Sequence, residues 1–458
     1  MAVESPHKRD TWGSKAAFIL AAAGSAVGLG NIWGFPTQAG RNGGAAFLII
    51  YLVAVAIIGA PVMLSELMIG RHTLRNPVGA FKQLAPRSAW YLVGGLGVLG
   101  GVTILSFYSV IAGWTLAYIV KAVSGAFGSE IDTAALFGGI SGSPVQAIGW
   151  HLLFMVITVW VVLGGIRKGI ERWTKVLMPV LFALLVLLAI RAVTLPGAGT
   201  GLDFYMKPDF SVVTASVVVN AVGQAFFSLS LGMGAMITYG SYVSKTDDLV
   251  SSAAWVTGFD TMIAMMAGLI IFPTLFASGF DPSVSGPGMV FVVLPSLLAS
   301  IPPEPYGGLI FGTGFFVLLG IAGLTSSISL LEVGVTWAVD ETRFSRKKAA
   351  ITLAAISFVV GIPSALANGA VPWLTSIPGI GMDFLTLMFT IFGVFSLIVG
   401  ALLISLFVGW YWGIEKAGEE VRANDGKFPL GRTWAFLIRW LVPIALGGVL
   451  INTVLQTF

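Results

Sequence analysis

The sequence contains no cysteine, only three histidines and few charged residues. The absence of cysteine excludes disulfides and thiolate metal sites. The histidines lie at the ends of predicted helices, with no metal cluster or nucleophile–base pair beside them, so an intramembrane enzyme is disfavoured. Charged residues make up 10% of the 458 residues, whereas 56% are apolar, and no soluble domain can bury that much apolar surface. The composition therefore predicts a protein that crosses a membrane many times.

Eleven apolar segments are long enough to span a bilayer, because a helix needs about 20 residues to cross a hydrocarbon core of about 30 Å. They lie near residues 15–40, 45–70, 89–125, 147–166, 172–194, 211–243, 250–277, 307–340, 348–367, 382–413 and 434–456. The polar N-terminus runs into the first segment without a small-residue cleavage site, so we expect that segment to be retained. No linker divides the chain, which predicts one transmembrane domain over residues 1–458, with its longest non-helical connections at 126–146, 195–210 and 278–306.

Basic residues gather in alternate connections between the predicted helices. Twenty of the 25 lysines and arginines lie at residues 8–15, 71–87, 167–175, 245, 343–348 and 416–432. Because cytoplasmic loops of membrane proteins carry an excess of lysine and arginine, we expect a cytoplasmic N-terminus and, after an odd number of crossings, a C-terminus outside. The basic residues follow the topology of the chain in the membrane, so the net charge of +4 does not indicate nucleic-acid binding.

The first and sixth segments contain residues that are unusual in a membrane helix. They read GSAVGLGNIWGFP over residues 24–36 and FFSLSLGMG over residues 226–234. Small residues also occur where helices pack closely, but Asn31 at membrane depth and Pro36, which lacks an amide donor, need a further reason. An odd number of crossings separates the two segments, so they have opposite orientations. This is typical of an inverted repeat with a site where two broken helices meet, here with repeats at 15–194 and 211–413 and an extra helix at 434–456.

The break in the first segment predicts the chemistry of its ligands. A half-helix that starts at Leu29 directs its free amides and positive dipole end toward the break, while the carbonyls of Gly24, Ala26 and Val27 lose their helical partners. Unpaired backbone groups in hydrocarbon cost several kcal/mol each, so a ligand, an ion or neighbouring protein must satisfy them. A carboxylate together with small hard cations, of which Na⁺ is the most available, satisfies both sets of groups.

Five stretches carry a specific resemblance to a known family. They are WGSKAAFILAAAGSAVGLGNIW, FYSVIAGW, GIRKGIERWTKVLMP, VGQAFFSLSLGMGAMITYGSY and AGLTSSISLLE. Over nearly its whole length the chain resembles the neurotransmitter:sodium symporters, and specifically their bacterial amino-acid branch. The resemblance implies an all-α integral membrane protein of LeuT type, a 5+5 inverted repeat with discontinuous helices 1 and 6 and eleven transmembrane helices. It further implies a bacterial inner (cytoplasmic) membrane, and a monomer or weak homodimer in the lipid bilayer.

The resemblance also implies two Na⁺ ions, both bound by oxygen atoms. The first ion would bind the Ala26 carbonyl, Asn31, Ser228, Asp260 and the carboxylate of the substrate. The second would bind the carbonyls of Gly24, Val27 and Ala322 and the hydroxyls of Thr325 and Ser326. From the residues alone, these two hydroxyls could equally bond to carbonyls of their own helix, and Asp260 could pair with a neighbouring helix.

The implied substrate is a hydrophobic L-amino acid. Its carboxylate would meet the amides of Leu29 and Gly30 and the Tyr108 hydroxyl, and its ammonium the carbonyls of Ala26, Phe227 and Ser230. The rest of the substrate set comprises Ile104, Met233 and Leu330 in the apolar pocket, Phe227 as its lid, and the polar Ser228 and Ser326. An ordinary buried aromatic remains the alternative for Tyr108. The flexible Met233 suggests that side chains from Leu and Val up to Phe and Trp are tolerated.

Gly28 restricts the class of substrate. Members of the family that carry monoamines have an aspartate at the matching position, which supplies the carboxylate that their substrates lack. With Gly28 in this sequence, the substrate must bring its own carboxylate.

A second charge argument concerns Asp260, where animal relatives have an asparagine and bind chloride nearby. The carboxylate of Asp260 implies transport that does not need chloride.

Residues near the predicted inner end match the family's cytoplasmic gate. Arg9 and Asp340 match the gate pair, and Trp12 and Tyr242 lie beside them. Glu332 replaces a neutral glutamine of some relatives. A carboxylate at membrane depth costs about 2.5 to 3.5 kcal/mol on insertion scales, so Glu332 needs a partner or a proton and is a candidate for proton coupling.

The outer gate departs from the family pattern. Asp383 is present, but Gly34 stands where the partner arginine is expected, and Arg41 lies seven residues along the helix. In the fifth helix, Gly169 and Pro179 match a segment that can unwind to admit water, although a plain kink is the alternative. We interpret Glu66 of the second helix, another buried acid, as structural.

These observations favour a sodium-coupled symporter that takes up hydrophobic L-amino acids by alternating access. An amino-acid sensor or a ligand-gated channel on the same scaffold is the alternative. The two differ in whether bound amino acid accumulates inside sealed vesicles.

Overall fold

The fold is built from helices. The computed structural model describes residues 10–128, 131–283, 286–299, 301, 306–423 and 427–457, and no β-strand occurs among these residues. Nine helices within the described ranges are long and apolar enough to cross a membrane. They are Ala45–Thr73 (α3 Ala45–Ala54, η2 Val55–Gly59, α4 Ala60–Thr73), Tyr91–Val123 (α6), Pro144–Leu163 (α8), Ile166–Val193 (η3 Ile166–Glu171, α9 Arg172–Val193), Leu249–Ala277 (α13), Gly308–Glu341 (η6 Gly308–Gly312, α15 Thr313–Glu341), Arg346–Leu366 (α16), Phe384–Arg422 (α18 Phe384–Met388, η7 Phe389–Phe395, α19 Ser396–Leu406, η8 Phe407–Gly413, α20 Ile414–Arg422) and Gly431–Leu455 (in α21 Gly431–Phe436, η10 Leu437–Leu441 and α22 Val442–Thr457).

The two segments that the sequence predicts to be interrupted are the two that break. The first consists of α1 (Lys15–Ala26), the π-helical turn η1 (Gly30–Gly34) and α2 (Phe35–Arg41), with a bend of 53° at the break. The sixth consists of α11 (Ala215–Ser228) and α12 (Ala235–Gly240), each too short to span a bilayer alone. Nine described helices qualify as membrane spans and the bent first pair makes ten, so the predicted count of eleven holds approximately, with α11 and α12 as the remaining broken crossing.

The connections between the spans contain short helices. These are α5 (Pro77–Leu84), α7 (Thr133–Ser141), α10 (Ala198–Met206), η4 (Phe210–Val212), η5 (Met289–Val293), α14 (Leu294–Ala299) and α17 (Pro372–Thr375). The expectation that residues 126–146, 195–210 and 278–306 are non-helical was therefore wrong for much of their length. Asp132 caps α7 by accepting the Ala135 N–H at 2.9 Å, and Phe291 of η5 packs its ring on Trp114 and Tyr118. Capping and apolar burial stabilise helices that are too short to appear as long apolar segments.

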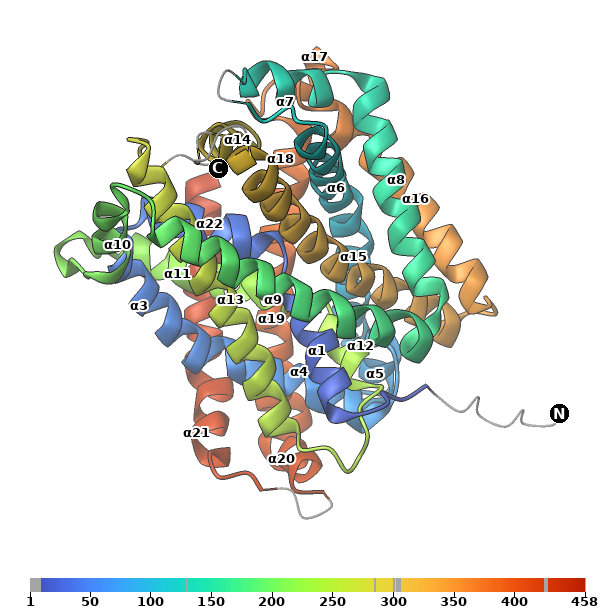
Figure 1. Ribbon diagram of the computed structural model, residues 1–458. Helices are drawn as coiled ribbons and strands as arrows, with labels where there is room; N and C mark the ends of the chain where they lie inside the picture. Colours follow the sequence, from blue (N-terminus) through green and yellow to red (C-terminus); the bar gives the residue numbers. More distant parts are fainter. Residues whose placement is uncertain are drawn as a thin grey trace.

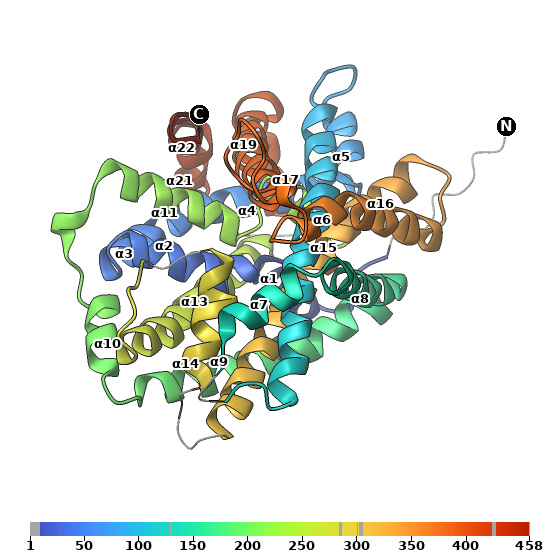
Figure 2. The same ribbon diagram turned by 90° about the horizontal axis from the view of Figure 1, so that it is seen from above.

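The broken helices lie in the middle of the bundle. Figure 1 shows α1 and α12 near its centre, and Figure 2 shows α1 between α13, α4 and α6 when the molecule is turned by 90°. α1 packs against α13 and α15, and α15 lies along α6. In Figure 1, α20 and α21 form the lower end of the molecule, whereas α22 ends in its upper half. The breaks therefore lie inside the bundle, as unpaired backbone at membrane depth requires.

Local sequence explains why the two helices stop where they do. Val27 leaves the helical region with ψ 110°, and the Asn31 side chain accepts the Gly28 N–H at 3.0 Å in place of a helical carbonyl. In the sixth segment Ser230 and Gly232 have φ of 53° and 86°. A Cβ atom on Gly232 would lie 2.2 Å from the Leu397 carbonyl oxygen, so only glycine allows this approach to α19.

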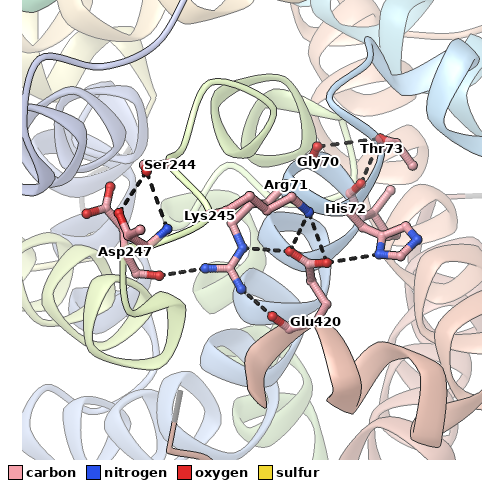
Figure 3. A network of polar contacts seen from close by, with 10 residues as sticks. Gly70, Arg71, His72, Thr73, Ser244, Lys245, Asp247 and Glu420 are labelled. Atoms are coloured by element: carbon pink, nitrogen blue, oxygen red, sulfur yellow. Dashed lines mark hydrogen bonds and ion pairs between the residues drawn. The ribbon is translucent and has the colours of Figure 1, made fainter. Parts of the chain in front are cut away.

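A buried ion cluster holds the lower end of the bundle together (Figure 3). The Glu420 carboxylate of α20 accepts hydrogen bonds from Arg71 Nε of α4 at 2.7 Å and from Lys245 Nζ at 3.0 and 3.1 Å. His72 Nδ1 lies 2.9 Å from the same carboxylate, and Arg71 also donates to the Asp247 carbonyl at 2.5 Å. One carboxylate therefore joins the end of α4, the connection between α12 and α13, and the tail of the tenth span.

We expect Glu420→Gln to destabilise the protein strongly. Arg71 is 1% exposed, so its charge would remain buried without a carboxylate, and breaking a buried pair costs about 3–5 kcal/mol. Asp203→Asn is the matched control, because the Asp203–Lys207 pair is 60% and 73% exposed and contributes at most about 1 kcal/mol. Thermal unfolding of the purified variants in detergent checks this. Equal midpoints for the two variants and the wild type would contradict it.

Candidate functional site

A buried polar cluster joins the two broken helices to α13. Asn31 Nδ2 donates to Asp260 Oδ1 at 2.7 Å and to Ser228 Oγ at 2.9 Å, and Ser228 Oγ donates to Asp260 Oδ2 at 2.8 Å. All three side chains are 0% exposed. Three of the four residues predicted for the first Na⁺ thus lie in direct contact, and the fourth, Ala26, ends α1 at the edge of the break.

The Asp260 carboxylate has only neutral partners. Among the residues that the structure describes, it accepts hydrogen bonds from Asn31 and Ser228 and forms no ion pair. Glu332 and Glu420 differ, since each of these buried carboxylates touches at least one arginine. A buried carboxylate without a cation is costly, so the surroundings of Asp260 favour a bound cation or a proton.

A second set of oxygen atoms lies where α1 meets α15. Ser326 Oγ donates to the carbonyls of Val27 at 3.1 Å and Ser25 at 3.2 Å, which links α15 directly to the break. Thr325 Oγ1 donates to the carbonyls of Ile321 and Ala322, each at 3.1 Å. The bonds within α15 are the alternative that the sequence left open for Thr325, whereas Ser326 reaches across to the other helix.

The remaining member of the second predicted sodium set also lies at this contact. A Cβ atom on Gly24 would lie 3.3 Å from Thr325 Cβ and 3.2 Å from Met178 Sδ of α9. The five residues predicted for the second Na⁺ are therefore brought together by the crossing of α1 and α15.

A cavity of about 590 Å³ begins beside the break. Its lining includes ten of the residues predicted to contact the substrate, namely Ala26, Leu29, Gly30, Ile104, Tyr108, Phe227, Ser230, Met233, Ser326 and Leu330. Ser228, the remaining one, is buried behind them in the Asp260 cluster. The cavity continues past the Phe227 ring to Arg41 and Asp383. Its inner wall is mainly apolar, with a polar rim where α1 is broken, which is typical of sites for small amphiphilic ligands.

The Tyr108 hydroxyl, at the polar rim of the cavity, can donate a hydrogen bond to a ligand. The Leu29 N–H donates to the Tyr108 hydroxyl at 3.0 Å, which leaves the proton of that hydroxyl available for an acceptor. A Cβ atom on Gly28 would lie 2.7 Å from the Tyr108 oxygen and 2.6 Å from Ser326 Oγ. The structure therefore leaves no space for a carboxylate side chain at position 28 unless both hydroxyls move.

The opposite end of the predicted path is closed by packed side chains. Trp12 is 6% exposed, donates from Nε1 to the Tyr239 carbonyl at 3.1 Å, and stacks edge-on against Tyr242. The Tyr242 hydroxyl donates to Glu332 Oε1 at 2.9 Å. Asp340 accepts the backbone and side-chain N–H groups of Asn76 at 2.9 and 3.2 Å. Arg9, the predicted partner of Asp340, lies outside the described residues.

Glu332 has the partner that its burial requires. The guanidinium of Arg346 meets it with two contacts, at 2.9 Å to Oε1 and 2.5 Å to Oε2. Thr336 donates to the same carboxylate at 3.1 Å. This bidentate pair compensates the charge of Glu332 without a proton, which weakens the case for a coupling role.

Asp383 and Gly34, the residues predicted at the outer gate, both line the outer part of the cavity. Asp383 caps α18 by accepting the Thr386 N–H at 2.9 Å, and Gly34 lies on the wall of the cavity. Gln224 Nε2 of α11 donates to the Gly30 carbonyl at 3.0 Å and so bridges the two broken helices above the centre.

Three residues that contact the candidate site were not identified from the sequence. Gln224 is one, and Tyr51 of α3 is another, because its hydroxyl donates to Ser228 Oγ at 3.2 Å. Phe389 of η7 is the third, with its ring edge-on to Phe227, the predicted lid, at 5.4 Å between the ring centroids. Gln224 could have been identified from the sequence, because it is a polar side chain within an apolar segment at membrane depth. Phe389 could not, because it does not differ from the other apolar residues of its segment.

Glu66 of α4 supports the second broken helix. Its Oε1 accepts the Gly232 N–H at 2.7 Å, and its side chain is 0% exposed. The break leaves the Gly232 amide without a carbonyl partner in its own helix, and the Glu66 carboxylate accepts its hydrogen bond instead. This contact is compatible with the structural role predicted for Glu66.

Comparisons with known proteins show which family this chain resembles over its length. The model of the sodium:neurotransmitter symporter family matches residues 9–130 and 138–458. An uncharacterised sodium-dependent transporter of Bacillus subtilis (strain 168) is 41% identical over 455 residues, with 98% of this chain and 99% of that protein covered. One from Methanocaldococcus jannaschii is 35% identical over 460 residues, covering 96% and 90%. The crystal structure of MhsT in complex with L-phenylalanine has 45% identity and a TM-score of 0.87, with 98% of this chain and 100% of that chain covered.

Proposed function

Because the chain belongs to the sodium:neurotransmitter symporter family, we propose that it takes up hydrophobic L-amino acids by coupling them to two Na⁺ ions. Sodium dependence follows from the family, and the relatives are transporters rather than enzymes. The observation that carries the proposal is the buried Asp260 carboxylate, which meets the broken first helix with neutral partners only. A small cation at this point offsets a charge that the described residues leave uncompensated.

The first Na⁺ would replace hydrogen bonds within the Asp260 cluster. Its ligands would be oxygen atoms of Asn31, Ser228 and Asp260 with the carbonyl of Ala26. Hard oxygen ligands suit Na⁺, and no group of three or more His, Cys, Asp or Glu among the described residues offers a site of another kind. The carboxylate of the amino acid would complete this site, so that ion and substrate bind together.

The second Na⁺ would bind where α1 crosses α15. The Ser326 hydroxyl lies 3.1 Å from the Val27 carbonyl, and Thr325 faces Gly24 across the same contact. The carbonyl of Ala322 would complete the site. Since α1 belongs to the first repeat and α15 to the second, this ion would hold two parts of the bundle together while the substrate is bound.

The cavity supports a neutral, apolar amino acid as the substrate. Gly28 leaves no space for a built-in carboxylate, and the Tyr108 hydroxyl, which accepts the Leu29 N–H, keeps its own proton for a carboxylate that the ligand brings. Ile104, Met233 and Leu330 line the space for an apolar side chain. MhsT, which has a similar fold, was crystallised with L-phenylalanine.

Transport would follow from the asymmetry between the two ends of the path. The cavity reaches Asp383 at one end, whereas Trp12 and Tyr242 pack together at the other. In the proposed cycle, Phe227 closes over the substrate and the Trp12 end then opens. We further propose that the protein lies in a bacterial inner membrane with its N-terminus, and the Trp12 end, in the cytoplasm, as the basic connections predict.

Uptake into proteoliposomes tests the proposal. We expect labelled L-phenylalanine to accumulate when an inward Na⁺ gradient is imposed, because the gradient drives ions and substrate through one shared site. Replacing Na⁺ by K⁺ on both sides should abolish accumulation. Equal uptake in K⁺ would refute sodium coupling, and Na⁺-dependent binding without accumulation would indicate a sensor instead.

The same vesicles test the substrate class through competitors. Unlabelled tryptophan and leucine should reduce the uptake of L-phenylalanine, whereas tryptamine, which lacks the carboxylate, should not. Tyr91→Phe is a control variant, since Tyr91 starts α6 outside the cavity and should leave uptake unchanged. Competition by tryptamine as strong as that of tryptophan would show that the carboxylate is not recognised.

Asp260→Asn tests the charge balance of the site. Two Na⁺ ions and a zwitterion leave an excess positive charge, and a carboxylate a few ångströms from an ion is worth several kcal/mol even at an effective dielectric constant of about 20. We expect wild-type uptake to persist when chloride is replaced by gluconate. Asp260→Asn should lose uptake or become dependent on chloride. Normal, chloride-independent uptake by this variant would remove the role proposed for the carboxylate.

A further inference from the structure

Two tryptophans hold an arginine on the outer surface of the last two spans. The guanidinium carbon of Arg439 lies 4.4 Å from the ring centroid of Trp410 and 5.9 Å from that of Trp440. The two indole rings meet edge-on at 4.8 Å, with an interplanar angle of 86°. Trp410 belongs to η8, near the end of the tenth span, whereas Arg439 and Trp440 belong to η10 near the start of the eleventh.

The cluster is fixed by the backbone as well as by the rings. Trp410 Nε1 donates to the Arg439 carbonyl at 3.2 Å. A Cβ atom on Gly409 would lie 3.2 Å from Arg439 Cα, so the two helices approach closely at this point. The fold therefore holds the backbone of Arg439 beside the Trp410 ring, and the guanidinium rests against that ring, which lowers the entropic cost of binding.

The cluster faces outward from the bundle. Trp410 and Trp440 are each 48% exposed, Phe436 one turn before them is 60% exposed, and Arg439 is also exposed. Within the described ranges, Arg439 forms no ion pair and its guanidinium makes no hydrogen bond to the protein. Glu415 and Glu419 of the neighbouring α20 are exposed as well, but neither pairs with it. The five N–H groups of the guanidinium are thus available to a partner outside the protein.

The position along the helix matches the edge of a bilayer. The span Gly431–Leu455 has 25 residues. At 1.5 Å per residue it is about 37 Å long, so about 7 Å extends beyond a hydrocarbon core of about 30 Å. If this excess lies at the start of the span, its first turn is in the headgroup layer, at the lower end in Figure 1. Arg439, eight residues after Gly431, lies about 12 Å along the helix, which is about 5 Å inside the edge of the hydrocarbon core, and its long side chain can extend from there toward the headgroups. Exposed tryptophan and arginine side chains are typical of this layer.

Arg432 adds a second exposed positive charge. It lies seven residues before Arg439, which is about two helical turns, so the two arginines fall on one side of the helix. Phe436 lies between them and offers apolar contact. A partner with one or two negative charges in the headgroup layer and apolar chains below it matches this pattern.

We propose that Trp410, Arg439 and Trp440 form a binding site for the phosphate group of an anionic phospholipid. The guanidinium would donate two parallel hydrogen bonds to the phosphate oxygens, and the indole rings would hold it in that orientation. Arg432 would add attraction from the headgroup side, and Phe436 would contact an acyl chain. Such a lipid bridges the tenth and eleventh spans, directly before α20 and the Glu420 cluster. This site is separate from the substrate cavity and does not depend on the proposed function.

Native mass spectrometry of the purified protein with added lipid tests the proposal. We expect the wild type to retain phosphatidylglycerol in preference to phosphatidylcholine at equal concentration. Arg439→Gln should weaken phosphatidylglycerol binding about tenfold or more, because it removes charge-assisted hydrogen bonds to the phosphate. Lys207→Gln removes an exposed positive charge elsewhere and should leave lipid binding unchanged. Inorganic phosphate at the same concentration should not compete, since it lacks the acyl chains.

A second measurement does not depend on the folding of a variant at Arg439. Tryptophan fluorescence of the wild type should be quenched more by brominated phosphatidylglycerol than by brominated phosphatidylcholine. This difference should disappear in the double variant Trp410→Phe, Trp440→Phe. Equal retention of both lipids by the wild type, or a preference for phosphatidylglycerol that survives Arg439→Gln, would overturn the proposal.

Discussion

The contact between the broken first helix and the Asp260 carboxylate is the constraint on which the rest of the structure depends. At membrane depth every polar backbone group and every charge must be satisfied within the protein or by a ligand. Asn31 meets this requirement in part, because it accepts the Gly28 N–H and donates to both Asp260 and Ser228. The charge of Asp260 is left without a cation from the described residues. An ion is the simplest partner that can come and go during a transport cycle.

The other buried carboxylates show how the chain treats charges that do not take part in binding. Glu332 is held by a bidentate contact with Arg346, and Glu420 by Arg71 and Lys245. Glu66, like Asp260, forms no ion pair within the described residues, but its Oε1 accepts a backbone amide of the second broken helix. Each of these groups stabilises a junction between helices near the ends or the centre of the bundle. Asp260 differs because its partners are the residues of the candidate sodium site itself.

The membrane spans and the two breaks could be predicted from the sequence because their signals are local. Long apolar runs define the spans, and Asn31 with its neighbouring glycines marks the first break. The short helices between spans were missed, since the apolar contacts of Phe291 with Trp114 and Tyr118 come from distant parts of the chain. Arg346 follows Glu332 by 14 residues, across a turn between two helices, so no helical spacing identifies the pair.

Within the site, the residue types were predictable and their mutual contacts were not. The match to family motifs identified the two oxygen clusters, but Tyr51 and Gln224 reach them from α3 and α11 through tertiary packing.

The most direct test of a shared site for ion and substrate is a linkage measurement on the purified protein. L-phenylalanine affinity is measured over a series of Na⁺ concentrations, and Na⁺ affinity over a series of L-phenylalanine concentrations. We expect each ligand to tighten the other by the same factor, as thermodynamic coupling requires. An L-phenylalanine affinity that is the same in Na⁺ and in K⁺ would contradict a shared site.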